Sequence, residues 1–157
     1  MLDIAPNTAT VKKAGDACVS ATRQMTSNTR KPLIAIVDDD PAICRALRRL
    51  VRTRQIDAKT FTSGRDFVYA LQTGPSFEPE CVILELHLQD VDGLELLRQL
   101  AASAPHIRVV VLTANNDART RQQALAAGAA AFFEKPLIDD TFVDTLLALI
   151  AQASGSA

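Results

Sequence analysis

The 157-residue sequence predicts an α/β protein built on a doubly wound parallel sheet. Short apolar runs alternate along the chain with segments of helical period, and the distance between runs suits crossover helices of normal length. The run Cys81 to Leu84 is continuously apolar, as expected of a strand that is covered on both faces. The expected strands cover residues 33–37, 58–61, 81–84, 108–112 and 130–133.

The first two expected helices each begin with a recognisable start signal. Asp40 and Pro41 form the acid-then-proline start of a helix. Its apolar stripe consists of Ile43, Leu47, Leu50 and Val51. Ser63, with Asp66 three residues later, predicts a second capped helix that ends at Leu71.

The remaining helices are predicted from apolar spacing and end signals. The third helix has a stripe of Leu94, Leu97 and Leu100. The fourth covers residues 117–127 and is closed by Gly128 as a C-terminal cap. Asp140 is expected to cap the last helix. Its core stripe is Phe142, Leu146, Leu149 and Ile150. Val143 and Leu147 flank that stripe, and they belong either to an exposed partner surface or to a wide core stripe.

The two ends of the chain differ in composition from its middle. Residues 1–30 are rich in Ala, Thr, Ser and Asn without a sustained period, which predicts a disordered or non-native tail. Met25 is an alternative start, so whether the residues before it are native stays open. The domain is expected over residues 32–151, with residues 152–157 as a short tail. Because only AQASGSA follows Ile150, we expect a stand-alone domain without an output domain.

The charge balance excludes an overall attraction to nucleic acid or membrane. The chain has 17 basic and 18 acidic residues and a net charge of -1. A basic face on the first helix is formed by Arg45, Arg48, Arg49, Arg52 and Arg54. A solvated face explains these arginines better than nucleic-acid contact, because no DNA-reading motif follows.

The cysteines indicate a reducing compartment. Cys18, Cys44 and Cys81 are odd in number and widely spaced, and only His87 and His106 are available to complete a metal site with them. No stretch reaches the ~18 apolar residues of a membrane span, and no signal-peptide core is present. A cytoplasmic location is therefore expected.

Polar residues follow the expected strands at the edge where ligands bind in such sheets. Asp38 and Asp39 follow the first strand, Glu85 ends the third, Thr113 ends the fourth and Lys135 follows the fifth. Clustered carboxylates repel each other unless a hard cation such as Mg²⁺ lies between them. A lysine and a hydroxyl opposite would hold the oxygens of a phosphoryl group. Taken separately, the acids are also consistent with a helix cap and a strand end.

These motifs resemble those of bacterial response regulator receiver domains. They are IVDDD at 36–40, FTSG at 61–64, LELHLQDVDGLELL at 84–97, VVVLTA at 109–114 and AGAAAFFEKPL at 127–137. The resemblance implies a flavodoxin-like receiver fold with sheet order 2-1-3-4-5. It also implies that a histidine kinase passes a phosphoryl group to an acid at the end of the third strand.

The resemblance assigns a role to each polar residue at this edge. Asp38 and Asp39 would hold Mg²⁺ together with the acceptor at 85 and the backbone carbonyl of His87.

Thr113 and Lys135 would bind the phosphoryl oxygens in this family. Phe132 is the switch aromatic, which follows the threonine inward when the domain is activated. The Lys135–Pro136 peptide bond is expected to be cis.

The sequence departs from the family pattern at two positions. Eight residues before Gly93, where the family has its phospho-acceptor aspartate, this chain has Glu85, which is one methylene longer. A displacement of ~1 Å can cost ~100-fold in a reaction that depends on positioning. Efficient phosphorylation is therefore not expected, and Mg²⁺ binding is expected to be weakened or absent. Gln89 replaces a usual proline, which implies a less rigid loop from Leu86 to Asp92.

Three functions remain open from the sequence. The first is a receiver that acts by protein–protein binding, independent of phosphorylation or weakly mimicking the phosphorylated state through Glu85. Its partner would be a histidine kinase or a downstream regulatory protein, with a possible homodimer through helix 117–127, strand 130–133 and the last helix. The second is a working phospho-acceptor, whose activity would be limited to its own phosphorylation and dephosphorylation. The third, a flavodoxin-like nucleotide binder, lacks the glycine-rich phosphate loop that such a protein needs.

Overall fold

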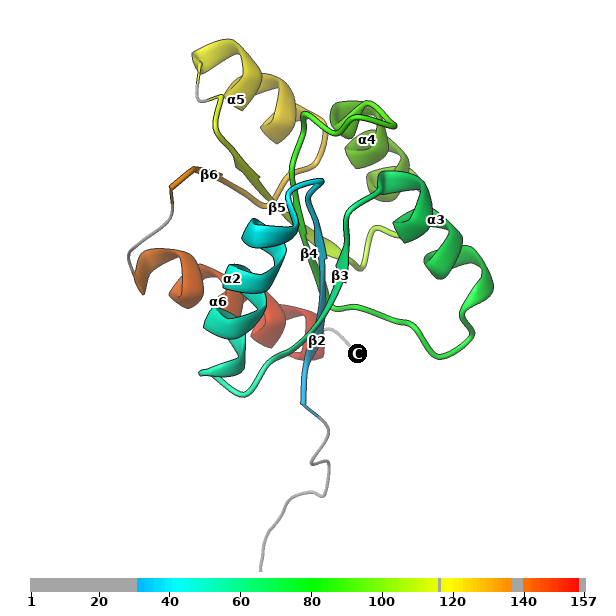
Figure 1. Ribbon diagram of the computed structural model, residues 1–157, viewed down its shortest axis with the longest axis vertical. Coiled ribbons are helices and arrows are strands. Elements are labelled where there is room, and N and C mark those ends of the chain that lie inside the picture. The colour runs from blue at the N-terminus through cyan, green and yellow to red at the C-terminus, as the bar shows by residue number, and fades with distance from the viewer. Residues whose placement is uncertain (1–30, 116, 137–139, 156–157) are drawn as a thin grey trace, which may run out of the picture. The chain divides into compact units, whose positions relative to one another are not determined.

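A five-stranded parallel sheet forms the centre of the protein (Figure 1). The structure is a computed structural model that describes residues 31–115, 117–136 and 140–155. The strands are Leu33–Val37 (β2), Asp57–Phe61 (β3), Cys81–Leu84 (β4), Arg108–Thr113 (β5) and Ala131–Glu134 (β6). Their order in the sheet is β3-β2-β4-β5-β6, and every pairing is parallel. This is the predicted order 2-1-3-4-5, so the fold class is confirmed.

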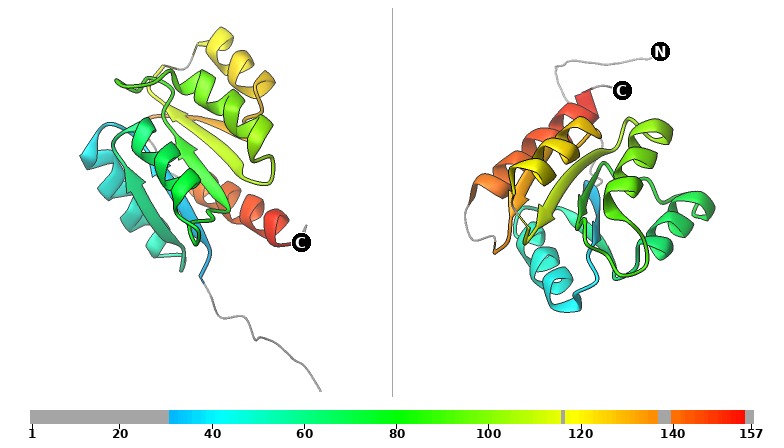
Figure 2. Two further views of the ribbon diagram at one scale, coloured as in Figure 1. Left: turned by 90° about the vertical axis from the view of Figure 1, so that its right-hand side faces the viewer. Right: turned by 90° about the horizontal axis from the view of Figure 1, so that it is seen from above.

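Helices cover both faces of the sheet. They are Pro41–Arg52 (α2), Gly64–Thr73 (α3), Gly93–Ser103 (α4), Ala118–Ala126 (α5) and Asp140–Gly155 (α6). Helices α2 and α6 pack on one face, where Ile36, Ile83 and Phe142 share a core cluster. Helices α3, α4 and α5 pack on the other face around Phe67 and Leu97 (Figures 1 and 2). Because both faces are covered, all four residues of β4 are buried, as the continuous apolar run predicts.

The predicted start signals coincide with the observed helix starts. The Asp40 carboxylate accepts a hydrogen bond from the backbone N–H of Ala42, and Pro41 is the first helical residue of α2. Ser63 Oγ accepts from the N–H of Asp66 at the start of α3. The polar side chains before α2 and α3 satisfy backbone donors that would otherwise lack a partner.

Helix α5 ends in the glycine cap that the sequence predicts. Gly128 has a φ of 117°, a conformation that side chains rarely allow. The N–H groups of Gly128 and Ala129 donate to the carbonyls of Leu125 and Ala124, which is the hydrogen-bond pattern of a Schellman motif. This end fixes where the chain turns from α5 into β6.

The last helix differs from the prediction at both of its ends, and its packing decides between the two alternatives for Val143 and Leu147. Asp140 is its first residue, and the residue before it lies outside the described part of the chain. The helix runs to Gly155, four residues beyond the expected domain boundary at residue 151. Val143 is only 1% exposed, and Leu147 packs partly buried against the same cluster, so the wide core stripe is the correct alternative.

Other sequence predictions concern the ends of the chain and membrane spans. The tail over residues 1–30, with Met25 and Cys18, lies outside the described residues. None of the helices in the described ranges is long and apolar enough to cross a membrane.

Candidate functional site

The carboxyl ends of four strands place the polar residues at one edge of the sheet. Asp38 and Glu85 are the residues that directly follow β2 and β4, and Lys135 directly follows β6. Backbone hydrogen bonds extend the ladders to them: Glu85 N–H donates to the Val37 carbonyl at 3.0 Å, and Lys135 N–H donates to the Thr113 carbonyl at 3.0 Å. The sheet itself therefore fixes the backbone from which these side chains project.

The Lys135 ammonium joins the two acids. Its Nζ donates to Asp38 Oδ2 at 2.7 Å and to Glu85 Oε1 at 2.7 Å. The two acids are buried and the lysine is partly buried, with 5% of Asp38, 7% of Glu85 and 17% of Lys135 exposed. The structure thus brings together residues that the sequence separates by 97 and 50 positions. A cation between two buried carboxylates balances charges that would otherwise carry a large desolvation cost.

Glu85 has partners for both carboxylate oxygens. Its Oε2 accepts from the backbone N–H of His87 at 2.9 Å, while Oε1 accepts from Lys135. Burial by itself would raise the pKa of Glu85, but the hydrogen bonds from His87, Lys135 and Thr113 outweigh burial and lower that pKa. Glu85 is therefore ionised at neutral pH.

Hydrogen bonds also fix the side chains of Asp38 and Lys135 and the charge of the lysine. Asp38 Oδ1 accepts from the N–H of Asp40 at 2.9 Å, and its other oxygen accepts from Lys135. Burial tends to lower the pKa of Lys135, but its bonds to Asp38 and Glu85 dominate and raise that pKa. The lysine is therefore a permanent cation at neutral pH. Its peptide bond to Pro136 is cis, as predicted.

The predicted magnesium ligands are paired with other groups of the protein. Within residues 31–115, 117–136 and 140–155, no three His, Cys, Asp or Glu side chains form a potential metal site. Asp39, predicted as a ligand, is partly exposed and does not complete such a group with Asp38 and Glu85. The Lys135 ammonium lies between the two carboxylates and contacts each of them at 2.7 Å. His87 contributes its N–H to Glu85, whereas the sequence prediction used its carbonyl.

Thr113 and Phe132 complete the predicted set. Thr113 is fully buried, and its hydroxyl hydrogen-bonds Glu85 and accepts from the backbone N–H of Asn115 at 3.3 Å. Phe132 is 6% exposed and lies in the core cluster on the face of α3, α4 and α5. The guanidinium of Arg121, on α5, lies over the Phe132 ring at 5.5 Å from its centroid.

The loop after β4 is tied to the start of α3 by Asp90, which the sequence reasoning missed. Its carboxylate accepts from Ser63 Oγ at 2.7 Å and from the N–H groups of Arg65 at 2.9 Å and Gly64 at 3.1 Å. A Cβ at Gly64 would come within 2.4 Å of a Val91 methyl, so the loop and the helix are in close contact. Although Gln89 replaces the usual proline, the loop is therefore fixed to α3 by the hydrogen bonds of Asp90 and by the close contact of Val91 with Gly64. No local sequence pattern indicated this contact, because its partners lie 25 to 27 residues earlier in the chain.

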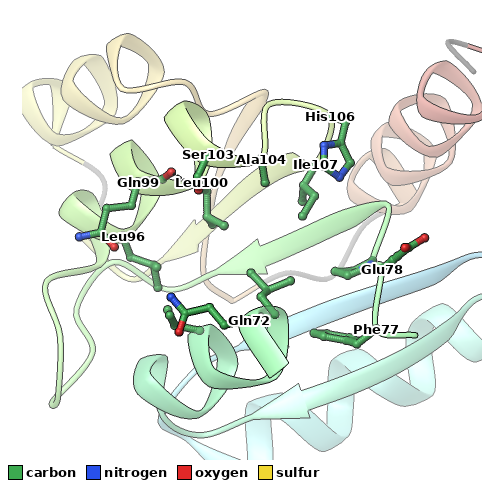
Figure 3. A pocket seen from close by; sticks show the side chains of 13 residues that line it. Gln72, Phe77, Glu78, Leu96, Gln99, Leu100, Ser103, Ala104, His106 and Ile107 are labelled. Carbon is green, nitrogen blue, oxygen red and sulfur yellow. Dashed lines mark hydrogen bonds between the residues drawn. The ribbon is translucent and has the colours of Figure 1, made fainter. Parts of the chain in front are cut away.

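A cavity in the described part of the chain lies away from these residues. It measures about 370 Å³ and lies between α3 and α4, where Leu71, Phe77, Leu96 and Leu100 form its apolar walls (Figure 3). Gln72 and Gln99 lie at its rim. The residues that line it include no member of the acid and lysine cluster. The chemistry predicted from the sequence therefore belongs to the sheet edge rather than to this cavity.

Comparison with solved structures defines the class of protein. The fold matches a response regulator receiver domain protein (CheY-like) from Methanospirillum hungatei with a TM-score of 0.74 and 18% identity, covering 82% of this chain and 100% of that chain. A response regulator receiver protein from Burkholderia phymatum is 43% identical, with a TM-score of 0.70 over 77% of this chain and 96% of that chain. The protein thus has a CheY-like receiver fold.

The family follows from the sequence match. The model of the response regulator receiver domain matches residues 34–147, and the chain belongs to that family. The transcriptional regulatory protein KdpE of Mycobacterium tuberculosis is 35% identical over 127 residues, which are 80% of this chain and 54% of that protein. The chain spans little more than half the length of the curated relatives it matches first. Receiver domains interact with histidine kinases and effector domains, and they typically bind Mg²⁺ at the phosphorylation site.

Proposed function

We propose that this receiver works in two-component signalling by protein–protein binding that does not depend on phosphorylation. In this proposal Glu85 stands where the family has its phospho-acceptor aspartate, and its carboxylate imitates a phosphorylated acceptor weakly. The observation that carries the proposal is the 2.7 Å contact between Glu85 and Lys135, together with the hydrogen bond of Glu85 to Thr113. These are the lysine and the hydroxyl that would otherwise hold phosphoryl oxygens.

The imitation is partial because a carboxylate supplies less charge than a phosphoryl group. Phosphorylation adds ~1.5 to 2 negative charges and three acceptor oxygens, whereas Glu85 has one charge and two oxygens. One of those oxygens is already bonded to the N–H of His87. Lys135 is also shared with Asp38. A full switch from off to on needs ~5.5 kcal/mol of differential interaction, which one shared ion pair does not supply.

Weak or absent magnesium binding is part of the same proposal. The carboxylate oxygens of Asp38 and Glu85 each accept from a protein donor, so a metal ion would compete with Lys135 for their charge. Dehydration of Mg²⁺ is costly, and two acids that already share a lysine cation offer less to offset that cost.

The proposed partner is a histidine kinase or a downstream regulatory protein in the cytoplasm. Cys44 and Cys81 are free buried thiols, which is consistent with a reducing compartment. Burial, followed by the charge of Asp38, raises the pKa of Cys44 to about 11, so this thiol stays protonated. The family assignment removes the reason to consider a nucleotide binder.

Incubation with acetyl phosphate and Mg²⁺ tests the proposal directly. The native chain and Glu85→Asp are compared by intact mass, with Glu85→Gln as the uncharged control. We expect little uptake by the native chain and a gain on the order of 100-fold for Glu85→Asp, because the shorter side chain restores the reacting position. A stoichiometric acid-labile adduct on native Glu85 would instead support the alternative of a working phospho-acceptor. An adduct on Asp38 would support the same alternative.

A further inference from the structure

The contact between Arg121 and Phe132 links α5 to β6. Phe132 pairs with Val111 in the sheet, and its ring is buried among the residues that α3, α4 and α5 cover. The guanidinium carbon of Arg121 is 5.5 Å from the ring centroid. Arg121 lies on the exposed side of α5, so it covers the ring from the solvent side of that helix.

The ring is the main partner for the Arg121 charge. Among the described residues, Arg121 forms no ion pair with a carboxylate. A guanidinium within ~6 Å of an aromatic centroid is attracted to the negative face of the ring. Turning the ring outward would break this contact and would also expose a large apolar side chain to water. Both effects favour the buried conformer.

We propose that Arg121 is a positioning residue that latches Phe132 in its buried conformer. The inference rests on the proposed function, in which the chain adopts part of the active arrangement without phosphate. The latch supplies a second bias toward that arrangement, and it is independent of the charge on Glu85. A family member with a different residue at this position would need another contact to hold the ring.

The expected effect is small and measurable. A cation–π contact at an exposed site contributes enough to change a two-state ratio by about two- to five-fold. Loss of the guanidinium should therefore raise the outward population of Phe132 by that factor. Lysine retains a cation at the position and should restore most of the buried population.

Fluorine NMR of the full chain labelled with 4-fluorophenylalanine measures this population. Phe132→Leu assigns the Phe132 resonance, and the difference in its shift between H₂O and D₂O reports exposure of the ring. We compare the native chain with Arg121→Ala, Arg121→Lys and Arg119→Ala. Arg119 is an exposed arginine of the same helix with no ring contact among the described residues, so its variant controls for the lost charge.

The latch is supported if exposure of Phe132 increases in Arg121→Ala, returns toward the native value in Arg121→Lys and does not increase in Arg119→Ala. An unchanged Phe132 resonance in Arg121→Ala overturns it, as does an equal change in Arg119→Ala. Circular dichroism confirms that each variant is folded. Phosphate uptake on Glu85 would contradict the proposed function but would not change the comparison of Phe132 resonances among the variants. Failure of the proposed function and failure of the latch are therefore distinguishable.

Discussion

Lys135 is the residue on which the charge balance of the sheet edge depends. Its ammonium is the shared donor to Asp38 and Glu85, which are buried, while the lysine is partly buried. Removing one partner of a buried ion pair leaves an uncompensated charge, which costs more than the intact pair contributes. Substitution of Lys135 should therefore lower the free energy of unfolding more than substitution of either acid does.

Lys135→Met should lower the free energy of unfolding by about 3–5 kcal/mol, because two carboxylates lose their cation. Urea denaturation monitored by circular dichroism measures the change. Glu85→Gln should cost less, because Lys135 keeps its bond to Asp38. Combined with Lys135→Met, it should recover part of the loss.

Lys31→Met, which removes an exposed lysine, is the matched control and should change stability by less than about 0.5 kcal/mol. A loss in Lys135→Met no larger than in this control would contradict the account of Lys135 as a buried counter-charge.

At the scale of elements, the sequence predicted where helices start and end better than it predicted the contacts between one element and another. The caps at Asp40, Ser63 and Gly128 are local patterns, so a single stretch of sequence contains the whole signal. The Asp90 anchor joins a loop to a helix about 25 positions earlier, and no local pattern encodes that distance. The contact of Arg121 with Phe132 was missed for the same reason.

The Asp90 anchor should make stability depend on acid pH. Its burial tends to raise the pKa, but hydrogen bonds from Arg65, Ser63 and Gly64 lower the pKa of Asp90 to about 2 from 3.8. Because the folded pKa lies below the unfolded value, the stabilisation is complete above pH 3.8 and is lost as the pH falls toward 2. We expect Asp90→Asn to be less stable than the native chain above that window.

Between pH 3.8 and about 2, the difference in stability between the native chain and Asp90→Asn should become smaller. Chemical denaturation at several pH values measures this difference in stability, with Glu78→Gln as an exposed control in the loop between α3 and β4. A difference that stays constant from pH 5 down to about 2 would show that Asp90 does not anchor the loop through its charge.

At the scale of the molecule, the sequence predicted a core on both faces of the sheet and the strand order. It did not predict how the side chains of the site pair with one another. Alternation of apolar runs and helical periods is sufficient for a doubly wound sheet. The sequence also indicated which residues meet at the sheet edge. It could not indicate that Lys135 lies between the two acids, because that depends on side-chain positions across β2, β4 and β6. The assignment of Asp38, Asp39, Glu85 and His87 as metal ligands stays a prediction.

The dimer surface proposed over α5, β6 and α6 can be tested through Leu125. This side chain on α5 is 44% exposed, whereas Val143 is buried and unavailable to a partner. If the proposal holds, sedimentation will show a dimer for the native chain and a monomer for Leu125→Asp, because a charge would be buried at the interface.

Tyr69→Asp is the control for this surface, because Tyr69 is 68% exposed on α3, outside the proposed face. A native chain that sediments as a monomer at all concentrations would argue against the dimer, and so would dissociation by Tyr69→Asp.

The long sequence separation of the Lys135 contacts also has a consequence for synthesis on the ribosome. The acids enter the growing chain 97 and 50 residues before the lysine that binds them. A nascent chain that has emerged only as far as β5 therefore has two carboxylates without the cation that they share, and closing such distant contacts is slow. The translated chain must extend past its last strand before the acids gain this cation, so a release from the ribosome before β6 would yield a fragment that cannot complete the sheet.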